Sequence, residues 1–186
     1  MPEPIVITDY NPGWPEMFNR ERMRVMAALS DMLVSIEHIG STAVPGIASK
    51  PIIDMVAGVR ALSAFDQCTR VLTSVGYIYD PYPQFPERRF FRDGSMGAGR
   101  HHLHLTEFEN DFWRDKVLFR DWLRTHPDDA EEYLVLKKAL AEQFGDDREK
   151  YERYTVGKSA FIEAILTRAR TGSNDPKRNE NARKTP

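Results

Sequence analysis

Residues 36–54 read Ile-Glu-His-Ile-Gly-Ser-Thr-Ala-Val-Pro-Gly-Ile-Ala-Ser-Lys-Pro-Ile-Ile-Asp, and this stretch decides the fold. A strand-like apolar run ends at Gly40-Ser41, and a second apolar run follows a loop and delivers one carboxylate, Asp54. Glycines at strand ends let backbone N–H groups approach an anion, and a nearby carboxylate can hold the divalent cation that accompanies a phosphate. The stretch therefore predicts a site for a nucleotide or another phosphorylated ligand.

The composition is that of one globular domain. The chain has 186 residues, of which 41% are hydrophobic and 29% are charged. Its formal net charge of -2 predicts no general nucleic-acid binding, so any anion site must be local. The only cysteine, Cys68, excludes an internal disulfide and fits a reducing compartment. Because neither a transmembrane run nor a signal peptide is evident, we expect a cytoplasmic protein that does not bind membranes.

Hydrophobic periodicity predicts an α+β chain. Strands are expected over residues 5–7, 34–39, 52–59, 77–79, 89–92 and 101–106, the last two as a hairpin. Helices are expected over residues 15–33, 62–75, 110–124, 128–144 and 147–169. We predict a single domain over residues 1–170, in which the helical part (about 110–169) packs on the sheet, followed by a disordered tail over 171–186.

The Gly40-Ser41 turn has two interpretations. Gly46, Lys50 and Asp54 follow within one short stretch, which favours a ligand site. Alternatively, Ser41 or Thr42 simply caps a helix, although such a helix start also binds anions readily. Asp54 itself lies in an apolar run, where desolvation is costly unless the carboxylate meets a cation or several donors. We therefore favour a catalytic or metal-binding Asp54 over a strand-end aspartate that faces water.

The segment His101–Thr106 alternates between polar and apolar residues. With a period of two, His102, His104 and Thr106 share one face of a strand. The two imidazoles could contact phosphate, transfer protons or bind a metal, whereas the alternative is a solvated polar face. A site of His102, His104 and either Glu107 or Asp54 would also suit metal-dependent hydrolysis. On the earlier strand, His38 is expected to reach the same cleft.

The helical third places cations within apolar stripes. Tyr133 with Lys137, and Tyr154 with Lys158, each combine an aromatic ring with a lysine one turn away. A lysine in such a stripe either extends to solvent or meets an anion. Because there are two such pairs, we expect both lysines to point at one phosphate-bearing ligand.

Arginines add further candidates for anion binding. Arg120 and Arg124 lie one turn apart, although Asp121 offers them a local ion pair instead. Arg88 and Arg89 stand at the mouth of the predicted hairpin.

Together these residues resemble the GrpB family. The resemblance covers about residues 5–168, and its motifs are His38-Ile39-Gly40-Ser41-Thr42-Ala43-Val44-Pro45-Gly46, Lys50-Pro51-Ile52-Ile53-Asp54, His102-Leu103-His104, Phe119-Arg120-Asp121, Tyr133 with Lys137, and Tyr154 with Lys158. It implies the nucleotidyltransferase fold of the DNA polymerase β superfamily, a mixed sheet flanked by helices. A similar domain is fused to dephospho-CoA kinase in some bacteria, which implies cytoplasmic, coenzyme-related biology.

The chain departs from the superfamily pattern at one position. Active members of the superfamily read Asp-x-Asp or Asp-x-Glu, a carboxylate pair that holds two magnesium ions, whereas this chain reads Asp54-Met55-Val56. One hypothesis is a nucleotidyl or phosphoryl transferase variant in which Asp54 holds a single Mg²⁺ or Mn²⁺ and His102 or His104 replaces the missing carboxylate. The alternative is a module that binds a nucleotide or a coenzyme A precursor without catalysis.

The candidate residues fall into two groups. Those for catalysis are Asp54, His102 and His104, with Asp54 also the candidate metal ligand. Those for ligand binding are His38, Gly40, Ser41, Thr42, Lys50, Arg89, Arg120, Tyr133, Lys137, Tyr154 and Lys158.

Overall fold

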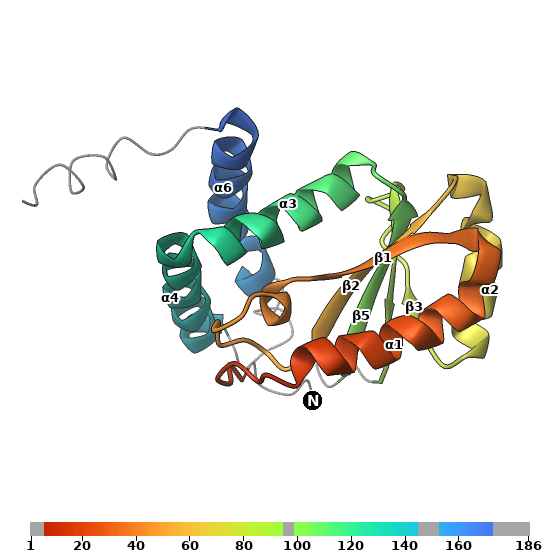
Figure 1. Cartoon of the computed structure of the whole chain (residues 1–186), viewed down its shortest axis with the longest axis horizontal. Coiled ribbons are helices and arrows are strands. Elements are labelled where there is room, and N and C mark those ends of the chain that lie inside the picture. The colour runs from red at the N-terminus through yellow and green to blue at the C-terminus, as the bar shows by residue number, and fades with distance from the viewer. Residues whose placement is uncertain (1–5, 95–98, 145–152, 173–186) are drawn as a thin grey trace, which may run out of the picture.

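The computed structural model describes residues 6–94, 99–144 and 153–172 (Figure 1). The strands are β1 (Leu33–Ile39), β2 (Ile53–Val59), β3 (Ile78–Asp80), β4 (Arg88–Arg92) and β5 (His101–Glu107). The helices are α1 (Trp14–Leu29), α2 (Phe65–Ser74), α3 (Asp111–Thr125), α4 (Pro127–Phe144) and α6 (Ser159–Thr171), with 3₁₀ turns at Ser30–Met32, Ser41–Ala43 and Leu62–Ala64. The predicted α+β class is confirmed.

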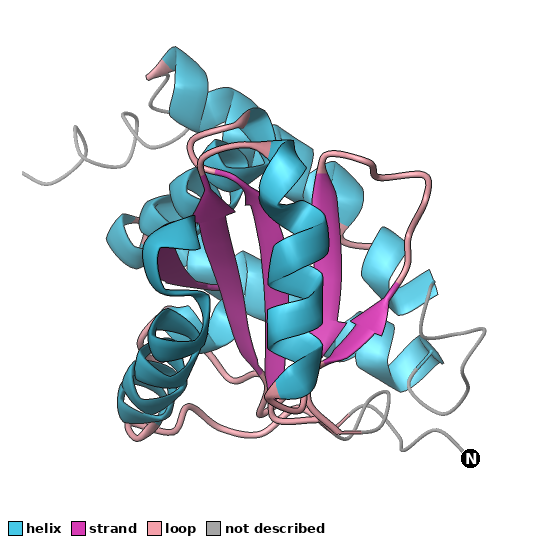
Figure 2. Ribbon diagram, turned by 90° about the vertical axis from the view of Figure 1, so that its right-hand side faces the viewer, coloured by secondary structure: helices cyan, strands magenta, loops and turns pink. Residues whose placement is uncertain are grey.

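The strands form a mixed sheet in the order β1-β2-β5-β4-β3, with helices in front of it and behind it (Figure 2). β2 and β5 are parallel, whereas the other neighbouring strands are antiparallel. In the β2–β5 pair, Asp54 lies opposite His102 and Val56 lies opposite His104. The register therefore places Asp54 of β2 beside His102 of β5.

Helices α1 and α2 cover one face of the sheet. Alternate strand residues point to this face, as the pleat requires. The buried cluster comprises Trp14, Val25, Leu29, Ile36, Ile53, Met55, Ala57, Val59, Phe65, Cys68, Leu72, Tyr77, Phe91, Leu103 and Leu105. Because Met55 and Leu103 point into this core, their neighbours Asp54, His102 and His104 point to the opposite face.

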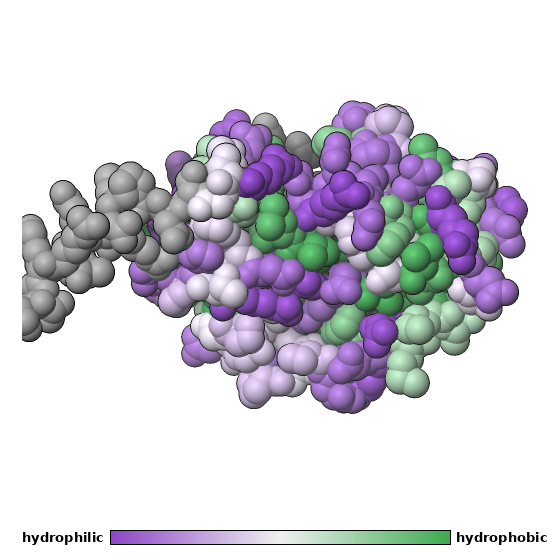
Figure 3. Space-filling view, turned by 45° about the horizontal axis from the view of Figure 1, so that its top comes forward, coloured by the Kyte–Doolittle hydropathy of each residue, from purple (hydrophilic) through white to green (hydrophobic). Residues whose placement is uncertain are grey.

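Helix α3 crosses that opposite face and packs against β1, β2 and β5. It begins where the Asn110 side chain accepts a hydrogen bond from the Trp113 N–H group, at 2.9 Å. Trp113 then packs with Ile39 and Val56 in a small apolar cluster. On the side of the molecule that carries α3, small apolar patches are separated by hydrophilic side chains (Figure 3).

Helices α4 and α6 lie at the end of the molecule opposite α2 (Figure 1). They pack on α3 and on the loop between β1 and β2. The buried residues of this cluster are Val44, Ile47, Ala48, Phe119, Leu123, Ala130, Tyr133, Leu134, Ile165 and Leu166. The helical third thus packs on the rest of the domain. In the described ranges, each helix is too short or too polar to cross a bilayer.

Two predicted elements need correction. The helix expected over residues 147–169 is interrupted, because α6 begins at Ser159 after a turn at Gly157. A Cβ atom on Gly157 would lie 2.7 Å from Leu140 Cδ2, so this turn packs directly on α4. Of the strand expected over residues 5–7, residue 5 lies outside the described residues and residues 6 and 7 are not in a strand, whereas Thr8 forms an isolated bridge with Ser49. Residues 145–152 and the tail after Gly172 lie outside the described residues.

Candidate functional site

The turn after β1 brings Gly40 against the carboxylate of Asp54. Gly40 has φ 71° and ψ -173°, a conformation that is open essentially to glycine alone. A Cβ atom at this position would lie 2.5 Å from Asp54 Oδ2. Ile39, which precedes Gly40, is the register partner of Asp54 in the antiparallel β1–β2 pair. Backbone and carboxylate therefore approach each other as closely as a glycine permits.

Asp54 and His102 form a hydrogen-bonded pair. Asp54 Oδ1 lies 3.1 Å from His102 Nδ1, and the side chains are 33% and 15% exposed, respectively. Burial raises the pKa of Asp54, but the hydrogen bond with His102 and nearby positive charge, including that of Lys50, outweigh it, so the pKa is lowered. Asp54 is consequently a carboxylate that accepts the Nδ1 proton of His102, which leaves the other ring nitrogen of His102 to act as a base.

His104 is held neutral by its surroundings. Burial lowers its pKa well below the ordinary value, and the charges of Arg88 and Lys116 lower it further. Arg88 Nη1 lies 3.3 Å from His104 Nδ1. Because a guanidinium can only donate, Nδ1 is the acceptor and the proton sits on Nε2. The His104 ring also lies against Phe90 and Phe112, with centroids at 5.0 and 5.4 Å.

Lys50 and Lys158 contact the same aromatic ring. Their Nζ atoms lie 5.1 Å and 4.2 Å from the ring centroid of Tyr154, which is almost fully buried. Burial lowers the pKa of Lys158 to about 7; Lys50 lowers it as well, whereas Asp54 acts in the opposite direction. The structure therefore brings the side chains of Lys50 and Lys158 together near Asp54.

Lys137 is the third lysine of this cluster. It is only 2% exposed, donates a hydrogen bond to the Ala48 carbonyl at 2.7 Å, and lies 5.1 Å from the Tyr133 ring centroid. Burial lowers its pKa to about 7, and the charge of Lys158 contributes to the decrease. Lys137 therefore supports the loop that carries Lys50, besides adding positive charge near it.

Lys116 is a residue of this site that the sequence analysis missed. It lies on α3, with Nζ 5.1 Å from the Phe112 ring centroid. Burial and Arg88 lower its pKa, whereas the negative charges of Asp54 and Asp115 act in the opposite direction. The available signal was its position one turn after Phe112 and one turn before Arg120, but that helical face contains both polar and apolar residues.

The hydroxyl groups of Ser41 and Thr42 have different hydrogen-bond partners. Ser41 is half-buried and hydrogen-bonds with Tyr133, whose own pKa is raised by burial and by Asp54. Thr42 is buried and donates to the Ile52 carbonyl at 3.1 Å. Ser41 thus lies near Asp54, whereas Thr42 closes the loop between β1 and β2.

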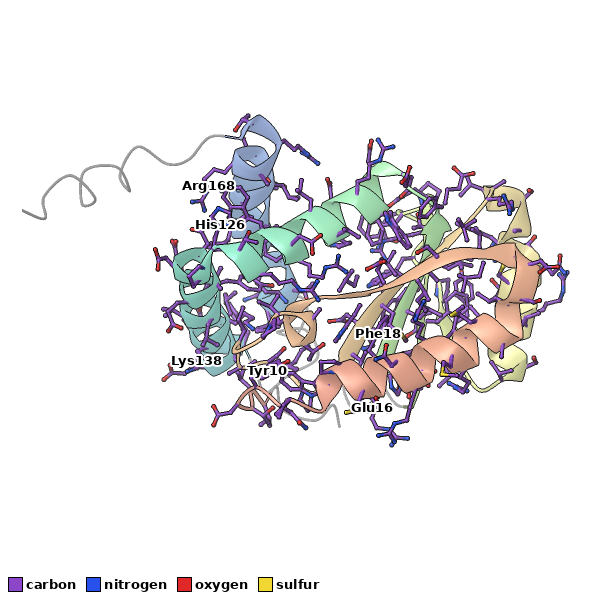
Figure 4. All side chains as sticks on the ribbon, in the orientation of Figure 1. Tyr10, Glu16, Phe18, His126, Lys138 and Arg168 are labelled. Atoms are coloured by element: carbon purple, nitrogen blue, oxygen red, sulfur yellow. The ribbon has the colours of Figure 1, made fainter. Side chains whose placement is uncertain are left out.

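The structure corrects the expectation for His38. Its ring stacks on Phe18, which points from α1 towards the sheet (Figure 4), with centroids at 4.8 Å. His38 Nε2 lies 3.0 Å from Thr42 Oγ1. Burial lowers the pKa of His38 to about 4. Because His38 shares the α1 face with Ile36, its side chain lies on the opposite side of the sheet from Asp54.

Two arginines also lie away from the expected site. Arg89 points to the α2 face, where it donates to Asp66 at 2.6 Å and to Thr69 at 2.8 Å. Its neighbour Arg88 takes the place beside His104, because successive strand residues face opposite ways. Arg120 is buried and ties α3 to β1 through Glu37 at 2.7 Å. Its guanidinium therefore serves an ion-pair network within the protein.

The donors do not fit the magnesium site that the resemblance implies. Magnesium requires several oxygen ligands in octahedral geometry, but here Asp54 faces Lys50, Lys116 and Lys158. Val56, where a second carboxylate would stand, is fully buried with Trp113. Among the described residues, no three His, Cys, Asp or Glu side chains are arranged to hold a metal ion.

The histidine-based metal site fits no better. Glu107 accepts a hydrogen bond from Leu62 N at 2.8 Å, and it shares its strand face with Leu105 rather than with His104. Nδ1 of His104 is taken up by Arg88. The excess of cations instead suits an anionic ligand.

Comparison with known proteins places the chain in a family. The model of the GrpB protein family matches residues 4–168. UPF0157 protein YqkA of Bacillus subtilis (strain 168) is 37% identical over 161 residues, which make up 87% of this chain but 46% of YqkA. The chain therefore spans less than half of that relative.

Solved structures agree. The crystal structure of conserved protein GrpB from Enterococcus faecalis has a TM-score of 0.78 and 34% identity, covering 88% of this chain and 96% of that one. Terminal uridylyl transferase 4 from Trypanosoma brucei, solved with bound dUTP, has a TM-score of 0.51 and 14% identity, covering 73% and 47%. The second likeness shows a nucleotidyltransferase-like fold, and the sequence matches decide the family: the chain belongs to the GrpB protein family.

Proposed function

We propose that this protein binds a phosphorylated small molecule of the nucleotide class on the sheet face that carries Asp54 and His102. The observation that carries the proposal is the convergence of Lys50 and Lys158 on the Tyr154 ring, at 5.1 and 4.2 Å. Ammonium groups placed this close repel each other, and partial burial adds a desolvation cost. A polyanionic ligand would relieve both costs, since it brings negative charge to the two ammonium groups.

The elements around these lysines support the same proposal. Gly40 and Ser41 turn directly beside Asp54, and the positive φ of Gly40 permits this turn. Lys116 and Arg88 continue the positive charge towards β4. The fold neighbour from Trypanosoma brucei was solved with dUTP, which motivates nucleotides as the first ligands to test.

The hydrogen bond between Asp54 and His102 favours a second candidate function, proton transfer during nucleotidyl or phosphoryl transfer. Asp54 accepts the Nδ1 proton and so fixes the tautomer in which the other nitrogen of the neutral His102 ring is the acceptor, the arrangement of a general base oriented by a carboxylate. His102 would take the proton of an acceptor hydroxyl or water as the oxygen attacks phosphorus, and the leaving phosphate would carry away the electron pair. The lysines would stabilise the charge that develops on the phosphate oxygens.

Calorimetric titration tests the binding proposal. Nucleoside triphosphates and inorganic triphosphate are titrated into the wild type, into Lys158→Gln and into Lys138→Gln. Lys138 is exposed on α4, so its replacement is a matched control (Figure 4). We expect Lys158→Gln to weaken binding about tenfold, the loss of one charge-assisted contact, and Lys138→Gln to change it little. Failure of every triphosphate to bind the wild type would refute the proposal.

A product assay tests the chemistry. Nucleoside triphosphates labelled at the α-phosphate are incubated with the wild type, Asp54→Asn and His102→Gln, with water as the universal acceptor. Wild-type release of nucleoside monophosphate, lost in both variants while binding survives, would establish the proton-transfer role. Binding without product in any sample would assign the protein to the non-catalytic class.

A further inference from the structure

An aromatic group lies at the β4 side of the site. Tyr82 and Phe85 belong to the loop between β3 and β4 and are 37% and 41% exposed. The Arg88 guanidinium lies 4.6 Å from the Phe85 ring centroid and 5.9 Å from that of Tyr82. Tyr82 also lies edge-on to Phe90, with ring centroids at 5.8 Å. Two exposed aromatic rings, Tyr82 and Phe85, therefore gather around one arginine, and Phe90 extends the group through Tyr82.

This aromatic group is continuous with the polar residues already described. The Phe90 ring lies 5.0 Å from the rings of both His102 and His104. Arg88 approaches His104 Nδ1 at 3.3 Å. β5 separates β4 from β2, so Phe90 stands two strand spacings, roughly 10 Å, from the strand that carries Asp54.

The site therefore has two chemically different ends. Lys50, Lys137 and Lys158 gather at the end formed by α4 and the start of α6, whereas Tyr82 and Phe85 lie on the β3–β4 side. In Figure 1 these elements lie on opposite sides of β2 and β5. A ligand that has phosphates at one end and a planar ring at the other matches this order.

Shielding of Arg88 alone does not account for the aromatic rings. Phe112, at 5.0 Å, already covers the guanidinium from α3, and Tyr82 and Phe85 remain more than a third exposed. Flat aromatic rings beside a guanidinium are suited to bind a nucleobase by stacking and cation–π contact. Pro81, Pro83 and Pro86 restrict the same loop, which lowers the entropy cost of ordering it around a ligand.

We propose that Tyr82, Phe85 and Arg88 bind the base of a nucleotide whose phosphates lie among Lys50, Lys116 and Lys158. This inference rests on the proposed function and narrows its ligand from any phosphorylated compound to one with an aromatic base. Stacking accepts every base, so selectivity between bases is expected to be weak.

The test compares ligands with and without a base. Affinities for the four common nucleoside triphosphates, for ribose 5-triphosphate and for inorganic triphosphate are measured by calorimetry. The proteins are the wild type, the double variant Tyr82→Leu/Phe85→Leu, and Met23→Leu, a control at a 70% exposed position on α1. We expect the wild type to bind nucleotides about tenfold more tightly than ribose 5-triphosphate, and the double variant to lose that preference.

The outcomes separate the two proposals. Equal wild-type affinity for ribose 5-triphosphate and for all nucleotides overturns the base site but leaves the phosphate site standing. A double variant that keeps the full preference for nucleotides also overturns it. Absence of binding by every triphosphate overturns both proposals. Leucine keeps the loop apolar, and unchanged circular dichroism and thermal midpoint verify that the double variant is folded.

Discussion

The carboxylate of Asp54 lies against Gly40 and leaves no room for a side chain there. A Cβ atom added to Gly40 would lie 2.5 Å from Asp54 Oδ2. Two independent constraints therefore act on Gly40. One is its positive φ of 71°, and the other is this close approach. Gly46 shares only the first constraint, since it has φ 82° but a Cβ atom added there would meet no heavy atom within 4 Å.

This contrast gives the first prediction. Gly46→Ala should cost about 1 kcal/mol of unfolding free energy, the usual penalty for a left-handed alanine. Gly40→Ala should cost clearly more, because it must also displace Asp54 from His102. Urea denaturation of both variants measures the difference. Equal costs would show that the Asp54 carboxylate moves aside freely.

Magnesium removal gives the second prediction. Because lysines rather than carboxylates face Asp54, we expect nucleotide affinity in EDTA to equal or exceed that in millimolar MgCl₂. Complexation by Mg²⁺ reduces the negative charge of the ligand, and so weakens its attraction to the lysines. Calorimetry in EDTA and in MgCl₂ measures the difference for the wild type and for Asp54→Asn. Asp31→Asn, at an exposed position, is the control for the loss of one carboxylate charge. Binding that occurs only with the metal would contradict this interpretation of the donor set.

The third prediction concerns alkaline pH. Lys137 has a folded-state pKa of about 7, below its ordinary value near 10.4. Between these two values the unfolded chain holds a proton that the folded chain lacks, so stability rises with pH. Below about pH 7 both states are protonated and this contribution is absent. The free energy of unfolding, measured against pH for the wild type, Lys137→Met and Lys138→Met, should rise less steeply above pH 7 in Lys137→Met alone.

The size of the effect sets the sensitivity needed. A single lysine changes the unfolding free energy by at most about 1.4 kcal/mol per pH unit. Curves for all three proteins that stay parallel from pH 7 to pH 9 would mean that Lys137 remains charged in the folded protein. Lys138, the exposed neighbour on α4, controls for the general change in net charge.

Acid pH gives the fourth prediction. Burial lowers the pKa of His38 to about 4, so His38 is protonated at a lower pH in the folded protein than in the unfolded chain. The stability that neutral His38 contributes is complete above pH 6.5 and is lost as the pH falls towards 4. His38→Gln can still donate to Thr42 but does not titrate. Its unfolding free energy should decline less than that of the wild type over this range, as thermal or urea denaturation would show.

Sequence reasoning predicted the strands of the sheet better than the directions of several side chains. The alternation of His102 and His104 with Leu103 was enough to assign a strand face, and the pairing confirms it. For Arg88 and Arg89 the sequence does not decide which one faces the core, because Phe90 and Phe91 put an apolar residue on each face of the strand. The choice follows from Phe91, whose burial beneath α2 puts Arg89 on the same side.

His38 and Lys116 show a different limit. The polarity of His38 suggested a ligand, yet the side chain satisfies itself by stacking on Phe18 and bonding to Thr42. Its face is set by the register with Met55, a contact between strands that spacing along the chain does not reveal. The role of Lys116 could be predicted only from the position of α3 across the sheet, and that position depends on the packing around Trp113.

The parallel pairing of β2 with β5 has a consequence for how the site forms during folding. Asp54 and His102 lie 48 residues apart, so their contact closes a long loop that contains α2, β3 and β4. Such a long-range contact adds its stabilisation late, after the entropy of loop closure has been lost. A ligand that bridges β2 and β5 should therefore slow unfolding much more than it speeds folding. It would stabilise the folded sheet kinetically.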